Sequence, residues 1–203
     1  MEQDRMNRSI KERFDHLLNI LRSEKFLKMK GLGKEVPFYI CPYDPKENEE
    51  MLRLADQLRD TLAADYGVQV LTVNLYDLSL DLLRERGILA RILEEESSYS
   101  KGELKELLQG VLDPEAHIIP AISNRMKQTQ FDVLFITGVG EVFPYIRSHN
   151  VLNNLQSAAK AHPTVMFFPG EYKQSLEEGA SLDLFDKLHD DRYYRAFNIY
   201  HAQ

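Results

Sequence analysis

The residue types best suited to chemistry follow a hydrophobic run, FDVLFIT, at positions 131–137. The next residues include Gly138 and Gly140, and glycines directly after a buried strand let backbone amides approach a phosphate group. The sequence matches the start of a dinucleotide-binding fingerprint, but Phe143 stands where the third glycine belongs, and the chain has no Walker A motif. Two interpretations remain: a phosphate-binding loop, or a tight turn that lets the following helix pack on the sheet.

A cation, a hydroxyl and an imidazole follow this loop at Arg147, Ser148 and His149. Together these groups could bind a phosphate or a carboxylate of a partner. The expected helix after them is unusually polar for one that covers a sheet, because asparagine stands at positions 150, 153 and 154. The alternative is that a residue of this segment caps the helix and the others face solvent.

Two carboxylates, Asp44 and Asp77, are expected at the ends of the first two strands, where such a pair could bind a divalent cation or transfer protons. Both also stand where helices need N-caps. The six histidines form no HxH or HExxH motif, so the sequence predicts neither a metal nor a cofactor. The single cysteine, Cys41, is expected to fill core volume, and no set of residues predicts catalysis.

These residues depend on a framework of strands and helices. Hydrophobic runs without a helical period predict five strands, and the run VQVLTVNLYDL is expected to be buried on both faces. Helices are expected over residues 45–66, 78–96, 101–112, 113–128 and 148–162, with Pro120 kinking or dividing the fourth. Residues 169–194 are expected to be an irregular surface segment with one short helix. The predicted fold is a three-layer α/β sandwich with a mostly parallel sheet, in which ligands bind at the carboxyl ends of the strands.

The amino-terminal segment has a helical apolar stripe at Ile10, Phe14, Leu17 and Leu21, which predicts an amphipathic helix from about Asp4 to Lys30. Residues 1–35 carry nine basic and six acidic side chains, a net charge of +3. Such a helix could bind a partner, form a homodimer or cover the sheet. We expect one domain over residues 1–203, with this helix and a linker at 1–33, then a Rossmann-like core at 34–203 with a helical insert around 78–128.

The composition limits the classes of function. With 25 basic and 32 acidic residues the chain has a net charge of −7, which argues against sequence-independent wrapping of nucleic acid. No apolar run approaches the roughly 20 residues that span a bilayer. The amino terminus is charged throughout instead of apolar, so we expect a cytoplasmic protein.

Several segments together resemble the BrxB family of bacterial BREX phage-defence systems. They are TGVGEVFPYIRSHNVLNNLQ (137–156), PTVMFFPGEY (163–172), YICPYDPKE, VNLYDL, LDPE and YYRAFNIY, so the resemblance covers nearly the whole chain. The family signature falls on Gly138, Gly140, Pro144, Arg147, His149, Asn153, Asn154, Pro169, Gly170 and Tyr172. It assigns no catalytic role to any of them.

The resemblance implies a non-catalytic accessory protein of a machine that contains an AAA-type ATPase, a PglZ-type protein with an alkaline-phosphatase fold, and an adenine methyltransferase. It implies assembly with the PglZ-type protein, with the ATPase as a further possible partner, and contact with DNA only through the complex. The expected anchors are Phe143, Tyr145, Arg147 and Tyr172, although the first two could lie in the core. The alternative is a degenerate nucleotide- or phosphate-binding regulatory domain. The candidate binding residues are Gly138, Gly140, Phe143, Tyr145, Arg147, His149, Asn153 and Tyr172.

Overall fold

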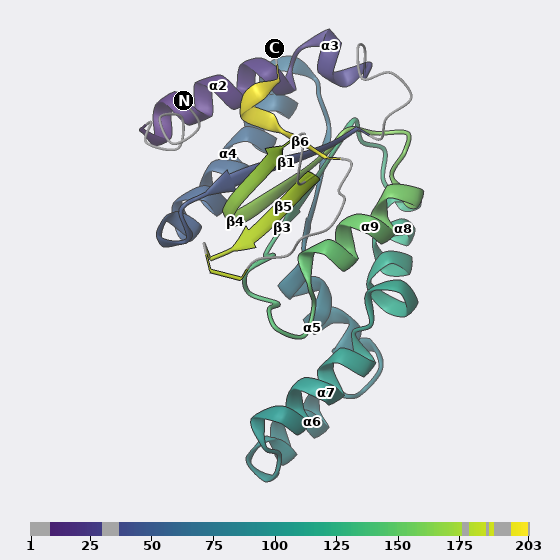
Figure 1. The fold of residues 1–203 in the computed structure, drawn as a ribbon. Helices are drawn as coiled ribbons and strands as arrows, with labels where there is room; N and C mark the ends of the chain where they lie inside the picture. The colour runs from purple at the N-terminus through teal and green to yellow at the C-terminus, as the bar shows by residue number, and fades with distance from the viewer. Residues whose placement is uncertain (1–8, 30–36, 176–178, 186, 189–195, 203) are drawn as a thin grey trace.

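The computed structural model describes residues 9–29, 37–175, 179–185, 187–188 and 196–202 (Figure 1). Its helices and strands alternate over most of the chain. The strands are β1 Phe38–Tyr43, β2 Val70–Asn74, β3 Val133–Thr137, β4 Thr164–Ser175, β5 Gly179–Leu184 and β6 Phe197–Asn198. The α-helices are α2 Ile10–Leu21, α3 Glu24–Leu27, α4 Asn48–Tyr66, α5 Leu75–Glu85, α6 Leu89–Glu95, α7 Lys101–Val111, α8 Ile119–Gln128 and α9 Ser148–Ala158. Shorter helical turns are η1 Pro45–Glu47, η2 Glu96–Ser98, η3 Pro114–Ile118 and η4 Ile199–His201.

The strands form one sheet in the order β2-β3-β4-β1-β6, and all neighbours on this path are parallel. Strand β5 pairs antiparallel with the second half of β4. Central strand β1 has no exposed residue, as expected for a parallel strand covered on both faces. The predicted fold, an α/β sandwich with a mostly parallel sheet, is therefore confirmed.

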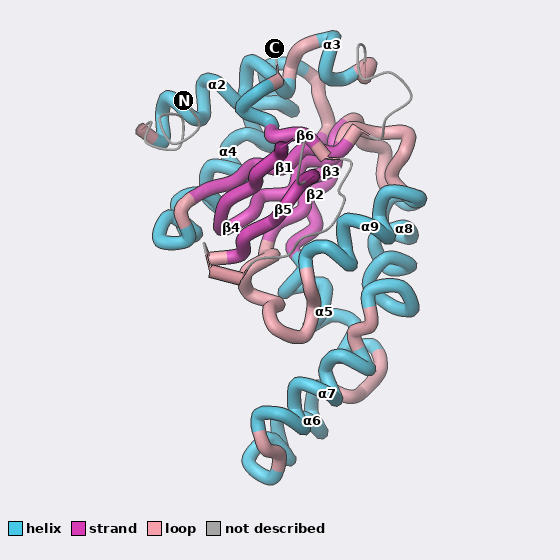
Figure 2. The backbone as a smooth tube through the Cα atoms, viewed as in Figure 1, coloured by secondary structure: helices cyan, strands magenta, loops and turns pink. Residues whose placement is uncertain are grey.

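Helices cover both faces of this sheet (Figure 2), and a hydrophobic layer lies on each face. Successive side chains of a strand point to opposite faces, so Phe38 and Ile40 join one layer while Tyr39 and Cys41 join the other. The first layer is completed by residues of α5, α8 and α9, and the second by residues of α2 and α4. The helices thus position the loops at the strand ends from both sides of the sheet.

The amino-terminal helix is shorter than predicted. A capping box between Ser9 and Glu12 starts α2, and the Ser23 hydroxyl accepts a hydrogen bond from the Phe26 amide and starts the separate helix α3. Residues 4–8 of the predicted helix lie outside the described residues. Leu17 and Leu21 are buried against α4 and the sheet, so the apolar stripe covers the sheet instead of facing a partner.

The second strand ends earlier than predicted. The Asn74 side chain accepts hydrogen bonds from the amides of Tyr76 and Asp77, and this N-cap starts α5 inside the hydrophobic run. Only Val73 of β2 is buried, because β2 lies at the edge of the sheet. Both faces of β2 are covered as predicted, since Leu71 and Val73 join one layer and Val70 packs against the other, but the burial is less complete than expected.

The helices between β2 and β3 largely follow the predicted pattern. The Asp113 side chain caps η3, and Pro120 lies in the first turn of α8, where it needs no intrahelical hydrogen-bond partner. Gly87 adopts φ +67° and separates α5 from α6. Helices α6 and α7 project away from the three layers as an arm (Figure 1). The division of the chain into a core and a helical insert stays a prediction.

The carboxyl-terminal part differs most from the prediction. Strand β4 continues beyond Phe168 and pairs with β5 from Gly170 opposite Leu184 to Ser175 opposite Gly179. The predicted irregular segment therefore contains a β-hairpin. The predicted last strand is only two residues long, because the Asn198 side chain caps the turn η4.

Candidate functional site

The loop after β3 is held in place by its own apolar side chains. Val139, Val142 and Ile146 are each at most 2% exposed and join the hydrophobic layer that α9 completes. Gly138 adopts φ +73°, a conformation that favours glycine. The side chains of Asn74 and Glu141 lie directly against its Cα. The space beside Gly138 is thus filled by protein atoms.

Gly140 is also enclosed by neighbouring side chains. A Cβ atom at this position would lie 2.9 Å from Cγ of Pro169 and 3.0 Å from Cε1 of Phe185. Phe185 in turn makes an edge-to-face contact with Phe143 at 6.2 Å between ring centroids. Both glycines therefore serve close packing of the loop against β2 and the β4–β5 hairpin, which favours the tight-turn interpretation over a phosphate cradle.

A chain of polar contacts crosses the carboxyl edge of the sheet beside this loop. The Tyr43 hydroxyl donates to Oδ1 of Asn48 at 2.7 Å, and Nδ2 of Asn48 donates to Oε1 of Glu141 at 3.0 Å. Burial raises the pKa of the Tyr43 phenol, so it remains a neutral donor. These contacts tie the start of α4 to the loop after β3 and place a carboxylate where a bound anion would be repelled.

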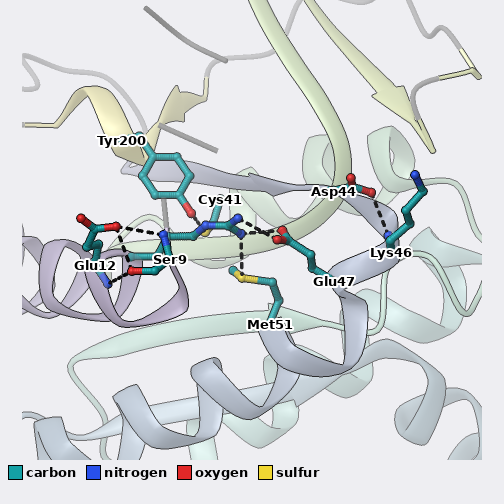
Figure 3. Close-up of polar contacts among 9 residues, drawn as sticks. Ser9, Glu12, Cys41, Asp44, Lys46, Glu47, Met51 and Tyr200 are labelled. Carbon is teal, nitrogen blue, oxygen red and sulfur yellow. Dashed lines mark hydrogen bonds and ion pairs between the residues drawn. The ribbon is translucent and has the colours of Figure 1, made fainter. Parts of the chain in front are cut away.

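The carboxylates Asp44 and Asp77 are not a pair. Strands β4 and β3 lie between β1 and β2, so the two residues do not follow neighbouring strands. Asp44 accepts from the Lys46 amide at 2.9 Å and caps η1 (Figure 3), while Asp77 lies in the first turn of α5. Within the described residues, no group of three or more His, Cys, Asp or Glu could hold a metal ion.

A groove lies beside the loop, where α9 begins near the β4–β5 hairpin. Its volume is about 220 Å³, and its lining residues are Phe143, Arg147, Ser148, Leu182, Leu184, Lys187 and Leu188. Arg147 and Lys187 are exposed, and the described residues of the lining include no carboxylate. Leu188 is 42% exposed. The groove therefore combines two cations with an apolar surface, a combination that suits an acidic segment with an apolar side chain.

The structure separates the predicted site residues into surface and interior positions. Arg147 and Asn153 are exposed, and Phe143 and Tyr145 are half-buried against the hydrophobic layer. His149 is 3% exposed.

Tyr172 is 2% exposed, so the prediction that it is a surface anchor is wrong. Its hydroxyl donates to the backbone oxygen of Ala196 at 2.7 Å, and burial raises the pKa of the phenol to about 12. Tyr172 joins the hairpin to the segment before β6, a role that stabilises the fold.

The sequence prediction missed Lys187 and Leu188, because their segment was expected to be irregular. A signal was present in the alternation of Leu182 and Leu184 with Ser181 and Asp183, which is typical of a strand.

Comparison with known proteins decides the family. A family model described as BREX protein BrxB matches residues 71–199. A BREX protein BrxB of Bacillus cereus (strain H3081.97) is 35% identical over 195 residues, which are 95% of this chain and 98% of that protein. The chain belongs to the BrxB family. A BREX protein BrxB of Escherichia coli O9:H4 (strain HS) is 27% identical over 187 residues, 92% of this chain and 90% of that protein. No solved structure matches the chain significantly.

Membership of the BrxB family confirms the resemblance found in the sequence and makes the protein a component of a BREX system. Several residues that carry the resemblance pack inside the loop region, among them Gly138, Gly140 and Tyr172. Arg147 instead faces the groove. None of the helices in the described part of the chain is long and apolar enough to cross a membrane.

A second polar cluster lies on the opposite face of the sheet, between α2 and the start of α4 (Figure 3). Arg13 is 2% exposed and donates to both oxygens of Glu47, at 2.7 and 2.9 Å. Nearby, the Cys41 thiol lies 3.6 Å from the Tyr200 hydroxyl, and burial raises the pKa of this thiol to about 12. Cys41 is therefore an inert core residue, as predicted. Arg13 joins α2 to η1 and to the start of α4.

Proposed function

We propose that this BrxB protein is a non-catalytic assembly component of a BREX phage-defence complex, and that it links a PglZ-type protein to the other subunits. The family supports a place in a BREX system. The PglZ-type partner comes from what the sequence resemblance implies.

The observation that carries the proposal is the groove at Phe143, Arg147, Lys187 and Leu188. Its two cations come from separate segments, the end of the loop after β3 and the residues after β5. A partner carboxylate can pair with the guanidinium of Arg147 while an apolar side chain contacts Leu188 and Phe143.

The loop after β3 favours binding because its backbone is fixed before a partner arrives. Val142 and Ile146 are buried and hold the backbone next to Arg147 in place. A surface that is ordered before the partner arrives loses less conformational entropy on association. The alternative of nucleotide regulation lacks comparable support, since Asn74 and Glu141 occupy the space beside Gly138.

The test is whether the protein co-elutes with the PglZ-type protein encoded beside it in size-exclusion chromatography. Light scattering on the eluted peak gives the mass of the complex. We expect a complex of defined stoichiometry with the wild type. The double variant Arg147→Ala, Lys187→Ala should bind at least about tenfold more weakly, because two groove cations are lost.

The matched control is Lys11→Ala, Lys25→Ala, which removes two exposed cations from α2 and α3. This control should bind like the wild type. If the wild type does not associate with the PglZ-type protein at micromolar concentration in low salt, the proposed link is wrong. If the control loses binding and the groove variant does not, the interface lies at the amino-terminal helices.

A further inference from the structure

The N-terminus of α9 opens beside the groove without a capping side chain. The helix has 11 residues and begins at Ser148, and the side chain of Arg147 before it makes no hydrogen bond to the first turn. The first amides of a helix have no partner within the helix, and they carry the positive end of its dipole. Such an end attracts anions when other groups converge on it.

Ser148 is the group that converges on this helix end. It is only 9% exposed, and it lines the groove. In the described part of the chain, neither its amide nor its hydroxyl has a hydrogen-bond partner. Its hydroxyl is not among the fully enclosed polar atoms that lack a partner, so it opens into the groove. Nearly buried polar groups are normally hydrogen-bonded, and Ser148 therefore has two unused donors at the groove.

The charges around Ser148 favour an anion. Arg147 and Lys187 are the charged residues among the described lining, and both are cations. The carboxylates nearest to them in the described sequence are engaged elsewhere. Glu141 accepts from the Asn48 side chain at 3.0 Å, and Asp183 pairs with a lysine of β4 at 3.2 Å.

The number of donors and charges indicates which anion fits. A phosphate monoester carries a charge of about −1.5 to −2 and three strong acceptor oxygens, whereas a carboxylate carries one charge and two oxygens. Two cations and the two donors of Ser148 match the phosphate better. The groove volume of about 220 Å³ leaves room for an organic group beside the phosphate. The walls that such a group would contact are apolar: Phe143, Leu182, Leu184 and Leu188.

We propose that the N-terminus of α9 binds the phosphate group of a small phosphate monoester, with Ser148 and Arg147 holding the phosphate and Lys187 neutralising its second charge. This site is separate from the glycines after β3, where side chains fill the space beside Gly138 and Gly140. Its regulatory consequence rests on the proposed function, because the same two cations bind the carboxylate of the protein partner. The ester and the partner therefore exclude each other.

The first test measures small anions by isothermal titration calorimetry on the full-length protein. The probes are phenylphosphonate, which is a stable analogue of a phosphate monoester, benzoate, which carries a carboxylate on the same ring, and inorganic phosphate. We expect phenylphosphonate to bind at least about tenfold more tightly than benzoate. Inorganic phosphate should bind more weakly than phenylphosphonate, because it leaves the apolar walls empty. If phenylphosphonate does not bind, or if benzoate binds equally well, the inference is wrong.

The second test uses variants of the site. Ser148→Ala should weaken phenylphosphonate binding at least about tenfold, because hydrogen bonds to a charged group are lost less cheaply than those between neutral groups. Its melting temperature should stay that of the wild type, because the hydroxyl has no protein partner to lose in the described structure. Arg147→Gln should also weaken binding. The matched control is Arg53→Gln, at an exposed position of α4, and it should bind like the wild type. Equal binding by wild type and folded Ser148→Ala would overturn the proposal.

The third test separates the site from its regulatory consequence. Saturating phenylphosphonate should weaken association with the PglZ-type protein at least tenfold in biolayer interferometry, with benzoate at the same concentration as the control. If phenylphosphonate binds through Ser148 but leaves this association unchanged, the mutual exclusion is wrong. If phenylphosphonate binds and the PglZ-type protein does not associate at all, the proposed function is wrong while the phosphate site stands.

Discussion

The buried ion pair of Arg13 and Glu47 predicts unequal effects for its two partners. Arg13 is 2% exposed, whereas the Glu47 side chain is 30% exposed. Replacing Glu47 by alanine removes the carboxylate that accepts two hydrogen bonds from the buried Arg13 guanidinium, which cannot lose its proton. Replacing Arg13 by methionine leaves a carboxylate that can still reach water. We therefore expect Glu47→Ala to destabilise the protein more than Arg13→Met.

The expected losses of unfolding free energy follow from the contacts of the two side chains. Removing one member of a buried ion pair costs about 3–5 kcal/mol, and the partial exposure of Glu47 places Glu47→Ala at the lower end, about 3 kcal/mol. Nη1 of Arg13 also donates to Sδ of Met51 at 3.6 Å; a methionine at position 13 loses this weak hydrogen bond but keeps the apolar packing of the side-chain stem. Arg13→Met should therefore cost only about 1 kcal/mol of unfolding free energy.

Urea unfolding at neutral pH, followed by far-UV circular dichroism, measures both free energies. Arg59→Met is the control, because Arg59 on α4 is 37% exposed and pairs with Asp56 and Asp60 on the surface. We expect this control to change stability by less than about 0.5 kcal/mol. The reasoning is refuted if Arg13→Met costs as much as Glu47→Ala, or if neither differs from the control.

Two further predictions concern alkaline pH and the glycine loop. Burial raises the pKa of Cys41 and of Tyr172 to about 12, above their ordinary values near 8.5 and 10, so the folded state keeps protons that the unfolded state releases. The free energy of unfolding should thus fall as the pH rises from about 9 to 12. Urea unfolding should have a lower midpoint concentration at pH 11 than at pH 8, and equal midpoints would contradict the prediction. Gly67 and Gly138 share similar angles, φ +68° and +73°, but only Gly138 has side chains against its Cα. Gly67→Ala should cost about 1 kcal/mol and Gly138→Ala clearly more, and equal melting temperatures would show that Asn74 moves aside freely.

The sequence predicts features that depend on local patterns. Apolar spacing and the Asp44 cap predict the helix that ends at Gly67, and the run FDVLFIT predicts β3. It fails where a cap interrupts a hydrophobic run, because Asn74 starts α5 inside a segment that is rich in β-branched residues.

The candidate site depends on contacts between distant segments, and periodicity carries no information about them. Arg147 meets Lys187 in the groove only because β4 turns back into β5. Arg13 reaches Glu47 across 34 positions of the chain. Neither pairing could be read from one sequence without the strand order.

The positions that carry the family resemblance act mainly through the shape of the loop region. Gly138 and Gly140 allow Asn74, Pro169 and Phe185 to pack closely, and Gly170 lies against the backbone of Asp183 where β4 meets β5. These contacts fix the loop after β3 against the hairpin, and the groove forms between them. These glycines thus hold together the two segments that supply Arg147 and Lys187 to the lining of the groove. A substitution that loosens this packing should weaken partner binding even though it touches no partner atom.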